Sequence, residues 1–302
     1  MNRDFSPPNL DTMPNNALKE ILSYLNIKER SVLRKVSRTL REAVDNNYTT
    51  VDVEFDFCIS HMITLTLDGI SIDYYSNDED KCKMLFDQKS KIVNSDYVET
   101  AKKDLGILLK NPNTRINNLK LRWQFLENFF EGLLRILTTF FDERTQNGWG
   151  GLCVETLDLV DDNGENIAQV LRLIDVNTIR SLQISCDDSA LYDEERFINL
   201  PQWRKLRDFQ LTGDAGNLDN ILNALGNIPF FHINQHENNM EITLESICQF
   251  VFTVLNPSEN FEYGKITSHN SGLHVSLINA HLILGNVSVK FQQNGIAMEK
   301  IE

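Results

Sequence analysis

This sequence lacks long apolar runs, a recognisable leader and paired cysteines. One of its longest apolar runs, at residues 128–141, is interrupted by Glu131 and Arg135 and is too short to span a bilayer. The first residues show no apolar signal region followed by a small-residue cleavage site. The five cysteines are scattered, odd in number and without a Cys-x-x-Cys pair, which indicates reduced thiols. We therefore expect a cytoplasmic or nuclear chain that does not enter a membrane.

The short motifs that mark most catalytic and cofactor sites are also missing. There is no Gly-x-Ser-x-Gly motif, and the glycine-rich turn at residues 148–151 lacks the Lys-Ser/Thr pair of a phosphate loop. A calcium loop centred on Gly164 fails because apolar residues fall where its first and last carboxylates belong. His232 and His236 lie four residues apart, but in a segment that reads as strand or loop and without an evident third ligand. We expect no metal and no cofactor, and an enzyme is the least favoured class.

Positive charge is scarce and unevenly placed in this acidic chain. The net charge of the 302 residues is −14, yet residues 1–50 hold eight Lys and Arg against six Asp and Glu. Phosphate binding depends on Lys and Arg, so the acidic remainder argues against nucleic acid as a partner. The basic residues between positions 28 and 41 form either a solvated helix face or a docking site for an acidic partner, and both alternatives stay open.

Residues 13–47 predict a compact helical unit. Pro14 suits the first turn of a helix, a second helix is expected from about Lys28, and a third over residues 37–47. The first helix carries one apolar stripe with the spacing i, i+3, i+4, i+7: Leu18, Ile21, Leu22 and Leu25. A segment of this size buries little by itself. These leucines therefore pack either on the rest of the chain or on another protein.

After residue 50 the hydrophobic period changes to that of strands. Residues 51–57 alternate strictly, and residues 63–74 form two alternating runs joined by Asp68-Gly69, the strongest short-range hairpin signal. The charged segment 76–81 predicts a loop. Residues 96–111 predict a helix that stops before Pro112.

A strand-like pattern with apolar residues at its second, fifth and seventh positions then recurs. It covers residues 115–121, 153–159, 178–184 and 205–211, with a weaker copy near residue 231. Helices are expected between the copies, at residues 125–145, 165–174 and 217–227, and again at 243–255. One strand and one helix per repeat is typical of leucine-rich repeats, which stack into a curved parallel sheet backed by helices. The alternating tail at 272–291 predicts strands that close the sheet.

The helical unit resembles an F-box, which begins Leu-Pro, continues into an Ile-Leu-x-x-Leu helix and closes on a Val-Ser-Arg stretch. The sequence MPNNALKEILSYLNIKERSVLRKVSRTLREAVD carries this likeness at residues 13–45. The matching residues are Pro14, Ile21, Leu22, Leu25, Leu33, Val36, Ser37, Arg38, Leu40 and Arg41. Met13 replaces the usual Leu, and Leu40 stands where many F-boxes have Trp.

The likeness continues beyond the helices. The segments ITLTLDGISIDYYS (63–76), DLGILLKNPNTRINNLKL (104–121) and ERFINLPQWRKLRDFQLTG (195–213) resemble the FTH domain of a large nematode family of F-box proteins. The segment FFHINQHENNMEITLESICQFV (230–251) extends it. We expect a tail at 1–10, the F-box at 11–48, alternating strands and a hairpin at 49–80, and the FTH domain at 95–302. The expected fold is of the α+β or α/β class: a three-helix F-box followed by an irregular leucine-rich-repeat-like sheet.

The resemblance implies a substrate-recognition subunit of a cullin–RING ubiquitin ligase. The F-box would dock on a Skp-type adaptor and through it on a cullin, while the FTH domain would hold an unidentified target protein. The chain would supply no catalytic group and would contribute proximity. The residues that we expect to contact the adaptor are Pro14, Leu18, Ile21, Leu22, Leu25, Leu33, Val36 and Leu40.

Strand alternation predicts where the target binds. Leu119 and Leu121 should face the core, so their neighbours face outward, and the same holds in the later copies. The outward residues expected to form one polar row are Lys120, Arg122, Asp158, Gln183, Asp208 and Gln210. The alternative is that these are solvated sheet positions and that loops bind the target.

Two other functions stay open. The chain could bridge a regulatory protein, such as an RNA-binding protein, into a complex without its degradation. It could also be a repeat scaffold with a silent F-box, in which Leu22, Leu25 and Leu40 pack on the chain's own hairpin.

Overall fold

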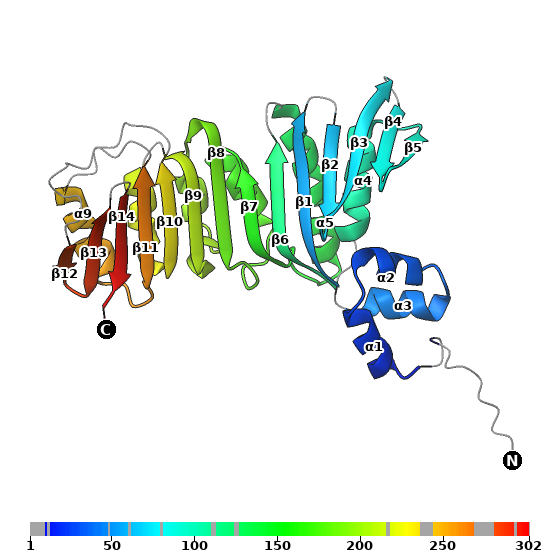
Figure 1. Cartoon of the computed structure of the whole chain (residues 1–302), viewed down its shortest axis with the longest axis horizontal. Helices are drawn as coiled ribbons and strands as arrows, with labels where there is room; N and C mark the ends of the chain where they lie inside the picture. The colour runs from blue at the N-terminus through cyan, green and yellow to red at the C-terminus, as the bar shows by residue number, and fades with distance from the viewer. Residues whose placement is uncertain are drawn as a thin grey trace, which may run out of the picture. The chain divides into compact units, whose positions relative to one another are not determined.

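The computed structural model describes residues 10, 13–47, 49–59, 62–78, 81–109, 113–123, 127–215, 218–235, 244–268, 281–292 and 295–301. The chain divides into two compact units, one formed by residues 1–54 and 61–117 and the other by residues 55–60 and 118–302. The fold is mixed α/β, with N-terminal helices followed by fourteen described strands of one mixed sheet (Figure 1). Among the described residues, no helix is both long and apolar enough to cross a membrane.

Three short helices open the first unit: α1 (Asn15–Ser23), α2 (Ile27–Leu33) and α3 (Arg38–Asn46). Helix α2 begins with a capping box, in which the Asn26 side chain accepts from the Glu29 amide at 3.0 Å and the Glu29 carboxylate accepts from the Asn26 amide at 2.9 Å. Helix α3 is capped by Ser37, whose Oγ accepts from the Leu40 amide at 3.1 Å. These caps fix where the helices start, so the predicted three-helix unit is confirmed.

A meander of strands follows in the same unit: β1 (Thr49–Ile59), β2 (Met62–Leu67), β3 (Ile70–Asp78), β4 (Lys81–Phe86) and β5 (Lys89–Val93). They lie in the order β1-β2-β3-β4-β5, and β2 to β5 pair antiparallel. Asp68 and Gly69 form the turn between β2 and β3 with φ of 50° and 75°, the positive values that a two-residue hairpin needs. The predicted Asp-Gly hairpin is thus confirmed.

Helix α4 (Tyr97–Leu109) confirms the helix predicted at residues 96–111, and it packs on this meander. The fully buried Tyr74 of β3 donates from its hydroxyl to Asp104 of α4 at 2.8 Å. Burial, together with the Asp104 carboxylate, raises the pKa of Tyr74 far above its ordinary value. The phenol therefore stays neutral and ties the helix to the sheet.

The prediction of a loop at residues 76–81 is wrong at both of its described ends. Strand β3 continues to Asp78, and β4 begins at Lys81. Strands β4 and β5 were not predicted either. Their solvent face carries lysines and only the opposite face is apolar: Cys82 is buried whereas Lys81 and Lys83 are exposed. Charged side chains are common on strands near a sheet edge, where they discourage pairing with other chains, and they hide the strand signal in the sequence.

In the second unit, parallel strands alternate with helices. The strands are β6 (Thr114–Trp123), β7 (Val154–Val160), β8 (Ser181–Leu191), β9 (Asp208–Ala215), β10 (Phe230–Gln235) and β11 (Tyr263–Ser268). The α-helices between them are α5 (Glu127–Gln146), α6 (Gly164–Arg172), α7 (Glu195–Ile198), α8 (Leu218–Ala224) and α9 (Leu244–Phe250). Short 3-10 helices cover Trp203–Lys205 and Leu225–Asn227, and a π-helix at Val251–Leu255 extends α9. The strands predicted from the recurring pattern are all present, as are the long helices.

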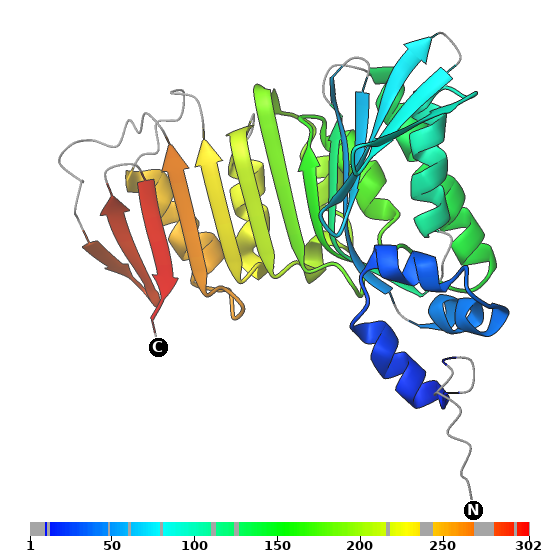
Figure 2. The ribbon, with the colours of Figure 1, turned by 45° about the vertical axis from the view of Figure 1, so that its right-hand side comes forward.

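The strands of this unit lie in the order β12-β13-β14-β11-β10-β9-β8-β7-β6, followed by residues 55–59 of β1. Strands β7 to β11 pair parallel, and β12 (His281–Leu284), β13 (Val287–Gln292) and β14 (Gly295–Lys300) add an antiparallel end. Closing strands were predicted at 272–291; residues 281–291 confirm this, residues 272–280 lie outside the described part, and β14 was not predicted. The strands stand side by side in Figure 2.

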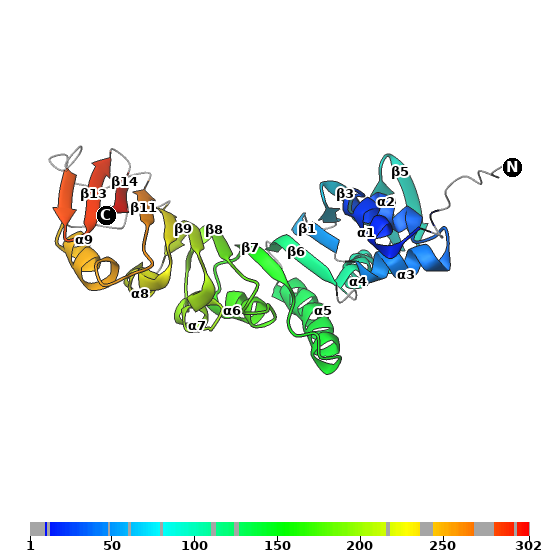
Figure 3. The same ribbon diagram turned by 90° about the horizontal axis from the view of Figure 1, so that it is seen from below.

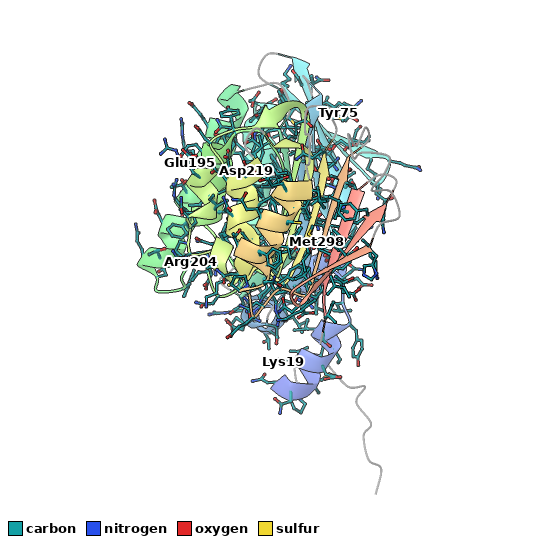
Figure 4. The ribbon with its side chains drawn as sticks, turned by 90° about the vertical axis from the view of Figure 1, so that its left-hand side faces the viewer. Lys19, Tyr75, Glu195, Arg204, Asp219 and Met298 are labelled. Atoms are coloured by element: carbon teal, nitrogen blue, oxygen red, sulfur yellow. The ribbon has the colours of Figure 1, made fainter. Side chains whose placement is uncertain are left out.

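The helices of this unit all cover one face of its strands (Figure 3). The buried side chains of β7 to β10 point toward them: Leu157, Leu182, Phe209 and Phe231 are fully buried and lie in register. Trp203 packs edge-on against Phe209 at 4.9 Å between ring centres and donates its indole N–H to the Ala224 carbonyl at 3.0 Å. Figure 4 looks onto this layer, with Glu195 on α7 and Asp219 on α8. The opposite face of these strands, which these helices do not cover, carries the alternate, outward-pointing side chains. We call it the open face.

Candidate functional site

The apolar stripe of α1 closes on the three-helix unit itself. Leu18, Leu22 and Leu40 are 2%, 1% and 1% exposed and form one cluster with Val44. Leu10, Leu25, Leu33 and Ala43 pack against this cluster. Leu18, Leu22 and Leu40 were expected to contact an adaptor. They are core residues of the three-helix unit instead, with almost no exposed surface. Their packing also differs from the silent-F-box alternative, because they contact one another in this cluster.

Other apolar residues of the unit do remain at its surface. Val36, between α2 and α3, is 66% exposed, and Val32 on α2 is 60% exposed. Tyr24 at the end of α1 is 79% exposed, and Pro14 is exposed at its start. Of the residues expected to contact an adaptor, Pro14 and Val36 are thus fully available, and Ile21, Leu25 and Leu33 are half-buried. Tyr24 and Val32 were not among them, although both lie beside the apolar stripe in the sequence.

Several basic residues of the three-helix unit already pair with acidic residues of this chain. Arg34 donates to both carboxylate oxygens of Asp45, at 2.6 and 3.1 Å, and this hydrogen bond raises the pKa of Arg34. Arg38 pairs with Glu42 at 2.9 Å, one helical turn away. Lys28 lies 3.4 Å from Asp87 and 5.4 Å from the centre of the Phe86 ring, so it contacts the β4–β5 turn. These contacts favour the solvated helix face over an electrostatic dock.

A polar row crosses the open face of the second unit, as predicted. Asp158, Gln183 and Gln210 are directly opposite one another on the adjacent parallel strands β7, β8 and β9. Strand β6 lies next to β7, and Lys120 on it reaches Asp158 at 3.4 Å. All four side chains are half-buried, and they stand on the face away from the helices.

The remaining two predicted row residues are also held by neighbours. Asp208 accepts through Oδ2 from Ser181 Oγ and from Gln210 Nε2, both at 3.0 Å. Arg122 lies 3.9 Å from Asp56 of β1. Most groups of the row are therefore paired with a neighbour on the sheet, although Arg122 Nε and Asp56 Oδ1 are buried without a hydrogen-bond partner. The binding role of the row stays a prediction.

The row continues over β10 and β11, where no row residue was predicted. Gln210 is opposite His232 on β10, and His232 is opposite Lys265 on β11. Burial, and then the charge of Lys265, lower the pKa of His232. His236, its partner in the zinc hypothesis, lies outside the described residues. Among the residues that are described, no group of three His, Cys, Asp or Glu side chains could hold a metal ion.

The acidic segment before Gly164, which does not fit a calcium loop, is the turn between strand β7 and helix α6. Asp161 accepts from the Asn163 amide at 3.0 Å, and Asn163 in turn caps α6 by accepting from the Glu165 amide at 2.9 Å. The Asp161 Oδ2 atom is buried without a hydrogen-bond partner, and burial raises the pKa of Asp161 to about 6. The Asp161 carboxylate therefore holds the turn through this hydrogen bond, and its ionisation lowers the stability of the folded chain.

Comparison with known families finds a match for the three-helix unit and another for much of the second unit. Residues 10–52 match the F-box domain, and residues 135–276 match the FTH domain. The chain therefore contains an F-box domain and a C-terminal FTH domain. It is distantly similar to F-box A protein 224 of Caenorhabditis elegans, with 24% identity over 280 residues that cover 87% of this chain and 67% of that protein.

Proposed function

We propose that this chain is the substrate-recognition subunit of an SCF-type cullin–RING ubiquitin ligase. An F-box domain generally implies an adaptor role in such a ligase and binding to a Skp-type protein. The three-helix unit would dock on that protein and through it on a cullin. The second unit would hold the target, and the chain would act in the cytoplasm or nucleus.

One observation carries the adaptor half of this proposal. The three-helix unit has a complete core of its own and still exposes apolar side chains at Val36, Val32 and Tyr24. Exposed apolar residues are ordinary when they are single, but a group of them on one small unit marks a contact surface. The proposed adaptor contacts are therefore centred on Pro14 and Val36, with Ile21, Leu25 and Leu33 at their edges. Leu18, Leu22 and Leu40 would support them from the core.

The target half rests on the open face of the second unit. We regard its strand–helix series as an irregular leucine-rich-repeat-like stack, because five parallel strands in sequence order present one continuous face. The polar row from Lys120 and Arg122 to Gln210 would contribute specificity rather than stability. Family members of this kind are typically non-catalytic, so the ligase chemistry would come from other subunits and this chain would add proximity.

Expression of the full chain and of Val36→Glu in cells tests the proposal. The wild type should co-purify with a Skp-type adaptor and a cullin, and Val36→Glu should lose both because docking would bury an unpaired charge. Lys120→Glu is the matched control, since it makes a charge change on the other unit and should leave adaptor recovery unchanged. Equal adaptor recovery with Val36→Glu would refute the proposed docking surface.

The same purification separates degradation from bridging. Blocking the proteasome should raise the amount of target that co-purifies if the target is degraded. A target whose level does not change would support the bridging alternative, in which a regulatory protein is recruited and kept.

A further inference from the structure

Two exposed aromatic residues lie side by side on the open face of the second unit. Phe230 begins β10 and Tyr263 begins β11, and the two are direct partners in the parallel register. They are 41% and 39% exposed, although neighbouring outward positions on β7 to β9 are polar. Adjacent strands are about 4.8 Å apart, so the two aromatic side chains leave the sheet from neighbouring positions. Aromatic residues of this kind are the usual anchors of protein interfaces.

A positive charge adjoins this surface. His232 and Lys265 follow the aromatic pair by two residues on the same strands and are also direct partners. Side chains two residues apart along a strand point to the same face and are separated by roughly 7 Å. The four residues Phe230, His232, Tyr263 and Lys265 thus make a two-by-two block, which we call the aromatic–basic patch.

The acidic groups around the patch are already engaged. Asp208, next to Phe230 on β9, accepts hydrogen bonds from Ser181 on β8 and from Gln210, two residues along its own strand. Glu299, next to Tyr263 on β14, pairs with Lys290 at 3.7 Å. Among the described residues, Lys265 forms no ion pair. Its charge is therefore available to an incoming carboxylate, in a chain whose net charge of −14 gives acidic partners no general attraction.

We propose that the aromatic–basic patch binds an extended target segment in which an acidic residue lies two positions from an apolar one. The carboxylate would pair with Lys265, and the apolar side chain would rest on Phe230 and Tyr263. The spacing follows from the sheet, because an extended segment aligned with the strands repeats its side chains at the same distance of roughly 7 Å. This inference rests on the proposed function and names the chemistry of its target.

The test uses the full-length chain, immobilised, and a phage-displayed library of random heptapeptides. Selection on the wild type should enrich Asp or Glu two positions from an aromatic or aliphatic residue. The best peptide, measured in solution by fluorescence anisotropy, should bind at least tenfold more weakly to Lys265→Glu and to the double variant Phe230→Ser/Tyr263→Ser. Arg204→Glu reverses the charge of an exposed residue on the short helix Trp203–Lys205, outside the sheet face, and should change the affinity less than twofold.

Either of two results would overturn the inference. One is selection that enriches no acidic position or no peptide at all, and the other is an affinity that Lys265→Glu leaves unchanged. Circular dichroism shows whether each variant is folded, and an unfolded Lys265→Glu is replaced by Lys265→Gln, which should still lose several-fold in affinity. Adaptor binding is measured on the same preparations. If it persists while the peptide result is negative, the inference fails and the proposed function stands.

Discussion

At the scale of single residues, burial and exposure separate the two roles that an apolar residue can have in the F-box. Leu22 and Val36 both match the F-box pattern, yet Leu22 is 1% exposed and Val36 is 66% exposed. The buried leucine contributes to stability, whereas the exposed valine is proposed to contact the adaptor. The sequence places both on apolar positions and does not tell them apart.

Replacement of Leu22 by Ala should lower the free energy of unfolding of the three-helix unit by about 2–5 kcal/mol, because it leaves a cavity among Leu18, Leu40 and Val44. Urea denaturation followed by circular dichroism measures this change. Val36→Ala on the same preparation should change it by less than about 0.5 kcal/mol. A loss of stability that is larger for Val36→Ala would contradict the assignment of these two residues.

Asp161 gives a pH-dependent prediction. Its pKa is raised to about 6 by burial in the folded chain, so the folded chain binds more protons than the unfolded chain between about pH 4 and pH 6. This residue's contribution to stability is therefore complete below about pH 4 and is lost as the pH rises through 6. Asp161→Asn, which cannot ionise, should be more stable than the wild type at pH 8 by roughly 1–3 kcal/mol.

Urea titrations at several pH values test this directly. The difference between Asp161→Asn and the wild type should shrink steadily below pH 6. A difference that is the same at pH 4 and pH 8 would show that ionisation of Asp161 is not its cause.

At the scale of elements, turns and bulges set the register on which the open face depends. The pairing of β8 with β9 shifts between Ser185 and Ala190, and Gly213 of β9 lies at that irregularity with a φ of 114°. A Cβ atom at this position would lie 2.3 Å from the Cys186 carbonyl oxygen. Both the backbone angle and the space thus require glycine there.

Gly213→Ala should destabilise the second unit by more than about 3 kcal/mol, because strain and a backbone clash add. Gly69→Ala is the matched control. Gly69 has a φ of 75° but nothing within 4 Å of its would-be Cβ, so only strain of about 1 kcal/mol is expected. Thermal unfolding of both variants compares them, and equal losses would contradict the role of the close approach at Gly213.

Much of the element content could be predicted from local sequence, for a physical reason in each case. The Asp68-Gly69 turn and the alternating strands carry their signal within a few residues, and the outward direction of Lys120, Asp158 and Gln210 follows from alternation alone. Strands β4 and β5 escaped because lysines occupy their solvent face. The partnership of Phe230 with Tyr263 joins residues far apart in the chain, so only the parallel register shows it.

At the scale of the whole molecule, the two proposed binding surfaces belong to different units. The apolar surface around Val36 lies in the first unit, and the polar row and the aromatic–basic patch lie in the second. The two surfaces belong to different compact units and share no residue, so a charge change on one should leave the affinity of the other unchanged.

The polar row offers a test of that separation at low risk to the fold. Lys120 pairs with Asp158 between half-buried side chains, and such pairs contribute at most about 1 kcal/mol. Lys120→Glu should therefore shift thermal stability only slightly while weakening the binding of a target that uses the row. Reversing Lys120 and Asp158 together would recreate the pair, so the single change is the sharper probe. An unfolded Lys120→Glu protein would contradict this description of the row.

The F-box of this chain is proposed to dock on a Skp-type adaptor through its exposed apolar surface. Isothermal titration of a purified Skp-type adaptor into the full chain measures it most directly. The wild type should bind saturably with one adaptor per chain, and Val36→Glu should bind at least tenfold more weakly while unfolding at the same temperature. Wild-type affinity in the Val36→Glu protein, or no binding by the folded wild type, would contradict the account.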